Sequence, residues 1–172
     1  MPHNVVLSIA SDKNYNLWMA TPHGISKFDG RIFKNYYPKG PSQENSASQV
    51  VVDGRNSIWA LVAIQLFRFR EDRFVREFQG KDTSICLTTD QSGNLWVFRY
   101  PEGIYVWNGQ SWHQELDTHT DRQMVIYKMA FGSFSGTLYC ITSQGLKIVD
   151  KGKLISPEWW KTQSHKSFPT SV

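Results

Sequence analysis

The chain contains one aromatic-centred pattern four times, and this repetition constrains the fold more than any other feature of the sequence. Each copy has a hydrophobic stretch, a turn, an anchor aromatic and, six or seven residues later, a glycine or glutamine. The four anchors are Trp18, Trp59, Trp96 and Tyr139. The period is about 40 residues, which is typical of stacked repeats, because one unit cannot bury its apolar side without a neighbour. The sequence therefore predicts four copies of one structural unit.

Two further apolar positions recur after each anchor. The first holds Phe28, Phe69, Trp107 and Val149, and the second, five residues further on, holds Phe33, Phe74, Trp112 and Leu154. A Trp side chain buries about 200 Å² and can fill the wedge between two twisted sheets. We therefore expect the anchors to pack between adjacent units. The alternative for these aromatics is a platform on which sugars stack.

Each copy is predicted to form four strands. In the first copy Val5, Leu7 and Ile9 alternate with small or polar residues, as in a half-buried strand, and a turn over 12–16 follows. Strands are expected over 17–21, 25–28 and 31–36, with a hairpin at Asp29-Gly30. The third copy repeats these signals over 85–115, while the second and fourth are less regular. No stretch has the apolar spacing of a helix.

These units predict an all-β fold, a β-propeller built of four four-stranded antiparallel blades. The blades are expected at about 4–37, 47–79, 83–116 and 124–156, followed by a tail over 157–172. A two-layer sandwich is the alternative, but a sandwich does not require the same residue types to recur at one phase in every sheet.

The stretches 9–28 (IASDKNYNLWMATPHGISKF) and 87–107 (LTTDQSGNLWVFRYPEGIYVW) resemble the two-component regulator propeller repeat. The resemblance covers all four copies in outline and is sharp in the first and third. It implies a propeller in the sensory part of hybrid histidine kinases and related regulators, where it helps to perceive a ligand, often a carbohydrate. Residues 103–112 also resemble a tectonin repeat, a propeller unit of lectins.

Three models of the finished ring remain open from the sequence. The chain is part of a larger ring, pairs with a second copy to make eight blades, or closes a four-blade ring within the usual range of about four to eight. An open array would leave an apolar sheet side of roughly several hundred Å² in water, which normally marks an interface.

Charge and composition argue against several classes of partner. The formal charge is +4, and basic and acidic residues alternate over 68–77, so we expect no nucleic acid partner. No apolar run is long enough to span a membrane.

Cys86 and Cys140 are predicted to be free, buried thiols, since nothing in the repeat phase places them opposite each other. The compartment would be extracytoplasmic (periplasmic) for a fragment of a sensor and cytoplasmic for a complete protein.

The strand order predicts that one side of the ring differs from the other. The turns between first and second and between third and fourth strands are short, whereas the opposite side carries the long segments 38–47, 80–84 and 117–123. Irregular loops on a rigid scaffold usually carry binding groups. The candidate binding residues on this side are His23, Gln65, Tyr100, Glu102, Gln144, Lys39, Gln43, Asp117, His119 and Arg122.

The sequence favours binding over catalysis. The five histidines are scattered, and no phosphate loop, Cys-x-x-Cys pair or Gly-x-Ser-x-Gly elbow is present. Asp117, His119 and Asp121 could face a cation but are expected to form an ordinary polar loop, so no metal, cofactor or catalytic residue is predicted. We expect a non-enzymatic sensory or binding segment with a polar ligand, such as a carbohydrate, or a protein partner. The alternatives are a tectonin-like lectin, an interaction scaffold, and a hydrolase or lyase.

Overall fold

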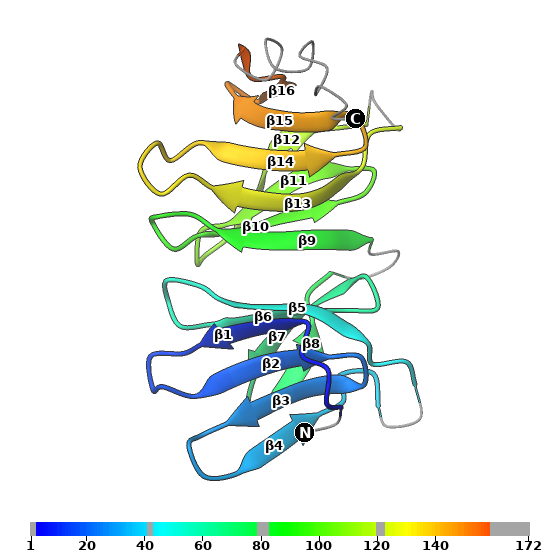
Figure 1. The fold of residues 1–172 in the computed structure, drawn as a ribbon, viewed down its shortest axis with the longest axis vertical. Helices are drawn as coiled ribbons and strands as arrows, with labels where there is room; N and C mark the ends of the chain where they lie inside the picture. The colour runs from blue at the N-terminus through cyan, green and yellow to red at the C-terminus, as the bar shows by residue number, and fades with distance from the viewer. Residues whose placement is uncertain (1–2, 41–42, 79–82, 120–122, 159–172) are drawn as a thin grey trace, which may run out of the picture.

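The described part of the chain consists of four antiparallel sheets. The computed structural model describes residues 3–40, 43–78, 83–119 and 123–158. Within these ranges sixteen strands form four sheets of four, and each sheet keeps the order of the chain (Figure 1). We call these sheets blades 1 to 4. The predicted fold class, an all-β propeller of four-stranded antiparallel blades, is confirmed.

The strand bounds follow the repeat. Blade 1 consists of β1 (Ser8–Ser11), β2 (Leu17–Thr21), β3 (Gly24–Phe28) and β4 (Phe33–Tyr36). Blade 2 consists of β5 (Ala47–Val52), β6 (Ile58–Val62), β7 (Gln65–Arg70) and β8 (Arg73–Arg76). Blade 3 consists of β9 (Ser84–Thr89), β10 (Leu95–Arg99), β11 (Gly103–Trp107) and β12 (Trp112–Asp117). Blade 4 consists of β13 (Ile126–Phe131), β14 (Leu138–Thr142), β15 (Gly145–Asp150) and β16 (Lys153–Ile155).

The first strand begins later than its alternation predicts. Val5 and Leu7 precede β1, and Leu7 keeps a single ladder bond, from its N–H to the carbonyl of Ala20 at 2.9 Å. The pairing strand β2 ends at Thr21, where the chain turns toward β3. The alternation of apolar residues therefore begins before the segment that pairs with the backbone of β2.

An aspartate, buried in blades 1 and 2 and half-buried in blade 3, organises the first turn of these blades. Asp12, Asp53 and Asp90 each accept a hydrogen bond from the indole Nε1 of the anchor six residues later, at 2.9, 3.0 and 2.9 Å. The same carboxylates accept backbone N–H groups of their own turns. Each aspartate therefore closes the hairpin and also orients the tryptophan that follows. In blade 4 the corresponding turn begins at Gly132, whose N–H donates to the carbonyl of Thr137 at 2.9 Å.

The first three anchors, Trp18, Trp59 and Trp96, lie between adjacent blades, as predicted, whereas Tyr139 lies on the last blade, with no following blade to pack against. The ring of Trp18 contacts Phe69 and Phe74 of blade 2, with centroid distances of 4.7 and 6.0 Å. Trp59 contacts Trp107 and Trp112 of blade 3 in the same way, at 6.1 and 5.8 Å. Trp96 lies 5.2 Å from Phe131 of blade 4 and packs in one cluster with Val149 and Leu154. Since Trp18 and Trp59 are 1% and 0% exposed, these rings serve packing and are not available to stack sugars.

The two cysteines differ in part from expectation. Both are free and buried, as predicted, but both belong to the core cluster between blades 3 and 4. Burial raises the pKa of Cys140 to about 12 and raises that of Cys86 as well. The repeat phase placed them in different blades, but packing of one blade on the next brings them into one cluster.

The four blades form an open arc. The first strands of consecutive blades are neighbours, β1 with β5, β5 with β9 and β9 with β13. Figure 1 shows blade 1 and blade 4 at opposite ends of the longest axis. It also shows the turns between first and second strands on one side of the arc and the longer connections between blades on the other. We call these two sides the turn face and the loop-rich face.

Candidate functional site

The loop-rich face carries the candidate residues in two groups that lie on different blades. The first group belongs to blade 1. The exposed ring of His23 stacks on that of His3, with centroids 4.9 Å apart. The buried side chain of Asn45 accepts the N–H of Lys39 at 2.9 Å and donates to the carbonyl of Gln43 at 2.9 Å. Asn45 therefore orders the segment that displays Lys39 and Gln43.

The second group lies at the end of blade 3, and we call it the blade 3 rim. Glu102 forms an ion pair with Arg99 at 2.7 Å, and its carbonyl accepts the N–H of Thr118 at 3.2 Å. The side chain of Asp117 accepts both the backbone N–H and the ring Nδ1 of His119, at 2.8 and 2.9 Å. These bonds to His119 hold the pKa of the Asp117 carboxyl below its usual value. The carboxylate therefore stays charged at neutral pH.

Tyr100 completes the blade 3 rim. Its N–H donates to the carbonyl of Thr83 at 3.0 Å, and its own carbonyl accepts the Thr83 hydroxyl. The Thr118 hydroxyl donates to the carbonyl of Pro101 at 2.9 Å. The turn between β10 and β11 is thus fastened to the segments before and after blade 3, which makes the rim a defined surface.

The blade 3 rim continues into a groove shared with blade 4. A cavity of about 310 Å³ is lined by Asp117 and Gln144 together with Thr118, Met124 and Lys147. Lys147 donates to the Ser156 hydroxyl at 3.0 Å, which places its ammonium group beside the cavity. The groove thus combines a carboxylate, an amide, a hydroxyl and a cation over an apolar floor.

The structure therefore brings together half of the predicted residues. Tyr100, Glu102, Asp117, His119 and Gln144 meet at the blade 3 rim and its groove. His23, Lys39 and Gln43 belong to blade 1 and the loop that follows it, and Gln65 is a half-buried residue at the start of β7 in blade 2. Arg122 and Asp121 lie outside the described residues.

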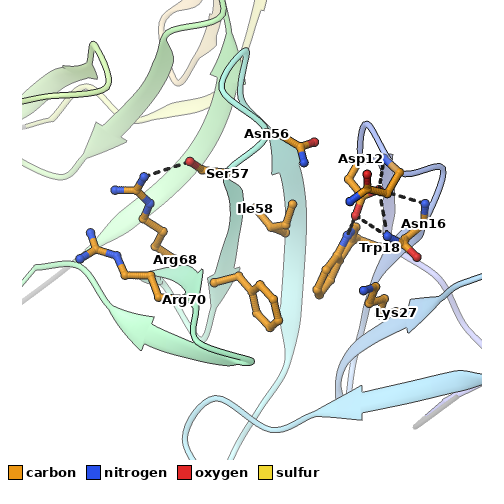
Figure 2. A pocket seen from close by; sticks show the side chains of 11 residues that line it. Asp12, Asn16, Trp18, Lys27, Asn56, Ser57, Ile58, Arg68 and Arg70 are labelled. Carbon is orange, nitrogen blue, oxygen red and sulfur yellow. Dashed lines mark hydrogen bonds between the residues drawn. The ribbon is translucent and has the colours of Figure 1, made fainter.

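A larger cavity lies beside the short turns that the sequence predicts to be structural. It has a volume of about 550 Å³ and opens on the turn face between blades 1 and 2 (Figure 2). Trp18 and Phe69 form its aromatic part, and the lining amides come from Asn14, Asn16 and Asn56. The asparagines of the turns 12–16 and 53–57 were the available signal, but asparagine is also a common turn residue.

Most of the polar groups in this cavity already serve the scaffold. Asn16 donates both backbone and side-chain N–H to Asp12, and Asn56 accepts the N–H of Lys13 at 2.7 Å. The ammonium of Lys27 lies 5.4 Å from the Trp18 ring. Lys27 is therefore a cation that this cavity presents beside its aromatic part.

The two arginines that border the cavity contribute little charge to it. Figure 2 shows Arg68 and Arg70 directed away from Trp18. This agrees with the alternation of side chains along β7, which places Phe69 on the opposite side of the strand from the two arginines. Arg68 donates to the Ser57 hydroxyl at 2.9 Å and covers the ring of Trp59. Burial, together with the charge of Arg70, holds the pKa of Arg68 below its usual value.

A related cavity recurs between blades 3 and 4. It measures about 340 Å³ and is lined by Asp90, Trp96, Phe131, Val149 and Lys151, among others. Asp90 and Trp96 are the counterparts of Asp12 and Trp18, so the repeat itself creates an opening beside the aspartate turn.

Metal-binding clusters and membrane-spanning helices are both absent from the described ranges. Among the described residues, no group of three His, Cys, Asp or Glu side chains is placed to hold a metal ion. Within the same ranges, the fold has no helix with the length and apolarity needed to cross a bilayer.

Comparison with known proteins places the fold among sensor and enzyme propellers. Residues 1–23 match the family described as two component regulator propeller, which confirms the resemblance of the repeat. No curated protein matches the sequence.

The solved structures that resemble the chain are larger than it is. The extracellular domain of the two-component system BT3049 from B. thetaiotaomicron is 22% identical, with a TM-score of 0.69 over 90% of this chain and 25% of its own. The corresponding domain of BT4673 from the same organism is 16% identical, with a TM-score of 0.67 over 90% and 22%. Virginiamycin B lyase from Staphylococcus aureus is 13% identical, with a TM-score of 0.63 over 90% and 56%. The chain therefore spans about a quarter of the sensor domains, and the likeness establishes the fold.

Proposed function

We propose that this chain is a non-enzymatic sensory or binding segment of a β-propeller, which holds a polar ligand or a protein partner on its loop-rich face. The observation that carries the proposal is the convergence of Asp117, His119 and Gln144 beside one groove between blades 3 and 4. The family match and the likeness to extracellular sensor domains support a sensory role and an extracytoplasmic location.

The chemistry of the groove favours a ligand with many hydroxyl or amide groups. Asp117 is an acceptor, Lys147 a donor, and Gln144 both, while Met124 and Leu154 add apolar contact. Such a mixture matches an oligosaccharide or a polar peptide segment better than an apolar molecule or a nucleic acid.

The proposed role is binding without catalysis. The lyase shares this fold, so the fold alone does not decide between binding and catalysis. Charged groups of the blade 3 rim are engaged in pairs that hold the scaffold, such as Arg99 with Glu102 and Asp117 with His119.

The test is a binding screen with matched variants. The wild-type chain is applied to an array of neutral and acidic oligosaccharides, and each hit is titrated by calorimetry. For the pair Asp117→Ala with Gln144→Ala we expect at least about a tenfold loss of affinity, equivalent to about 1.4 kcal/mol. The control pair, Asn14→Ala with Lys27→Ala, alters the cavity of the turn face and should leave the affinity within about twofold.

The opposite outcomes are equally informative. Loss of binding in the control pair alone would place the ligand in the cavity between blades 1 and 2. An array without hits would favour a protein partner, and capture of that partner should then respond to Glu102→Lys. Turnover of virginiamycin B by the wild-type chain would contradict the non-enzymatic part of the proposal.

A further inference from the structure

Each contact between adjacent blades joins two different sides of the repeat. One side carries the anchor and faces the next blade, as Trp18 and Trp59 do. The other side carries the recurring apolar pair and faces the preceding blade, as Phe69 with Phe74 and Trp107 with Trp112 do. We call these the anchor side and the receiving side. Every blade has both, so each end of the arc has one without a partner blade.

Blade 1 exposes its receiving side. Phe28 lies opposite Phe33 in the ladder and stacks on it, with centroids 4.6 Å apart. These two rings are the counterparts of Phe69 and Phe74. Phe33 is 46% exposed, whereas Phe74, covered by Trp18, is 7% exposed. Ile9, in β1 of the same blade, is also exposed.

Blade 4 exposes its anchor side. Tyr139, the fourth anchor, pairs with Ala130 and Ile148 on neighbouring strands, which places all three on one side of the sheet. Ile141 shares that side by alternation and is 53% exposed. The end of blade 4 therefore presents an aromatic and aliphatic surface of the kind that blades 1 to 3 press against their neighbours.

The distribution of exposed apolar side chains follows the same rule. Blade 3, which has a neighbour on both sides, contributes no large exposed hydrophobic side chain among the described residues, and blade 2 contributes Ile64, in the turn between β6 and β7, and Val75 at 37%. Those on blade 1, its leading segment and the residue after it are Val5, Val6, Leu7, Ile9, Tyr15, Ile32, Phe33 and Tyr37. Those on blade 4 are Tyr127, Phe134, Ile141 and Ile155. Exposed apolar surface on this scale normally marks an interface.

We propose that a second copy of this chain covers both ends. The anchor side of blade 4 in each copy would pack on the receiving side of blade 1 in the other, with Tyr139 over the pair Phe28 and Phe33. This contact continues an interface that the chain already makes at each of its three internal boundaries. Two copies would close a ring at the upper end of the usual range of about four to eight blades.

The geometry of the two ends supports a second copy as their occupant. The two unpartnered sides lie at opposite ends of the longest axis (Figure 1), so they do not meet within one chain. They are unlike each other, which makes a head-to-tail contact complementary and a contact between like ends poorly matched. In blades 2 to 4 the receiving side packs against the sheet of the preceding blade, and not against a helix.

The experiment is a measurement of solution mass by light scattering. The wild-type chain is expected at twice the 19.9 kDa of one copy. Phe33→Asp places a charge on the receiving end, and Ile141→Asp places one on the anchor end, so each variant alone should have the mass of one copy. Ile64→Asp is the matched control, because Ile64 is exposed to a similar degree, at 57%, but lies in the turn between β6 and β7 of blade 2, and it should keep the wild-type mass.

Mixing the two variants tests complementarity directly. Phe33→Asp retains a normal anchor end and Ile141→Asp a normal receiving end, so an equimolar mixture should recover the mass of two copies through one intact contact. Circular dichroism on each variant checks that the β-sheet signal is retained.

Several results would overturn the proposal. A wild-type mass of one copy would mean that a second copy does not cover the ends. A variant that still pairs with itself would show that the pairing does not depend on Phe33 or on Ile141. A mass that keeps rising with concentration would indicate an open head-to-tail chain instead of a closed pair.

Discussion

At the scale of single residues, the aspartate of the repeat links turn chemistry to blade packing. Oδ1 of Asp12 accepts the backbone N–H groups of Asn14 and Asn16, and Oδ2 accepts the indole of Trp18. Burial pushes the pKa of this carboxyl upward, but the bonds from Trp18 and Asn16 outweigh it, so the pKa lies below its ordinary value of 3.8. The charged form is therefore the one that the fold requires.

Asp12→Asn should destabilise the chain at neutral pH. The new amide cannot accept all of these hydrogen bonds, so we expect the free energy of unfolding to fall by about 1 to 3 kcal/mol, measured by urea unfolding. Because the pKa in the fold is depressed, the advantage of the aspartate is full above about pH 4 and is lost as pH falls through the folded-state pKa.

The difference between wild type and Asp12→Asn should therefore shrink below pH 4. Asp150→Asn, at an exposed position of β15, is the control and should behave like wild type throughout. A gap between wild type and Asp12→Asn that stays constant down to pH 2 would contradict the role assigned to the charged carboxylate.

At the scale of elements, the first turns of consecutive blades are joined to one another. Lys13 donates through Nζ to the carbonyl of Gly54 at 3.1 Å, and Gly54 donates to the carbonyl of Gly93 at 2.9 Å. Gln91 continues the series by donating to the carbonyl of Ser133 at 2.8 Å. The turn face is therefore a continuous set of contacts between blades.

Gly54→Ala should weaken the boundary between blades 2 and 3. A Cβ at this position would lie 2.6 Å from the Cα of Gly93, so the two turns would have to separate. We expect a loss of about 1 to 3 kcal/mol in the free energy of unfolding, as for overpacked sites. Ser133→Ala, at the equivalent position of blade 4, should change stability little. Equal stability of the two variants would show that the turns separate without cost.

At the scale of the whole molecule, stability should be distributed along the arc. Each blade contacts its neighbours in the chain, so the array behaves as a quasi-one-dimensional stack whose ends lack one interface. Trp59, at the central boundary, is fully buried, whereas Tyr139, at the end of the arc, is half-buried.

Hydrogen exchange measured by mass spectrometry should report this gradient. In dilute wild-type protein, amides of β3 and β14 should exchange faster than those of β6 and β10, because end blades open without disturbing the centre. Raising the protein concentration should slow exchange in β3 and β14 but not in β6 and β10 if a second copy covers the ends. Uniform exchange at all concentrations would contradict both the gradient and the covering.

The sequence predicted which face of the arc carries the candidate site, but not which residues meet there. The long segments 38–47 and 117–123 marked the loop-rich face, because turn and loop chemistry is local. Which of their residues meet depends on how one blade is rotated on the next, and so Gln144 joins Asp117 while His23 remains with blade 1. The cavity beside Trp18 was missed because its asparagines resemble ordinary turn residues.

The sequence by itself determined the repeat, the four antiparallel sheets and the aromatic contacts between them. These features follow from alternation, turn residues and side-chain volume, which act over a few neighbouring positions and recur in each copy. Only the tertiary structure decided where the cavities open, that Cys86 and Cys140 share one cluster, and that the arc ends in two unlike apolar sides. Those outcomes depend on the packing of one blade against the next, a relation between residues that are far apart in the chain.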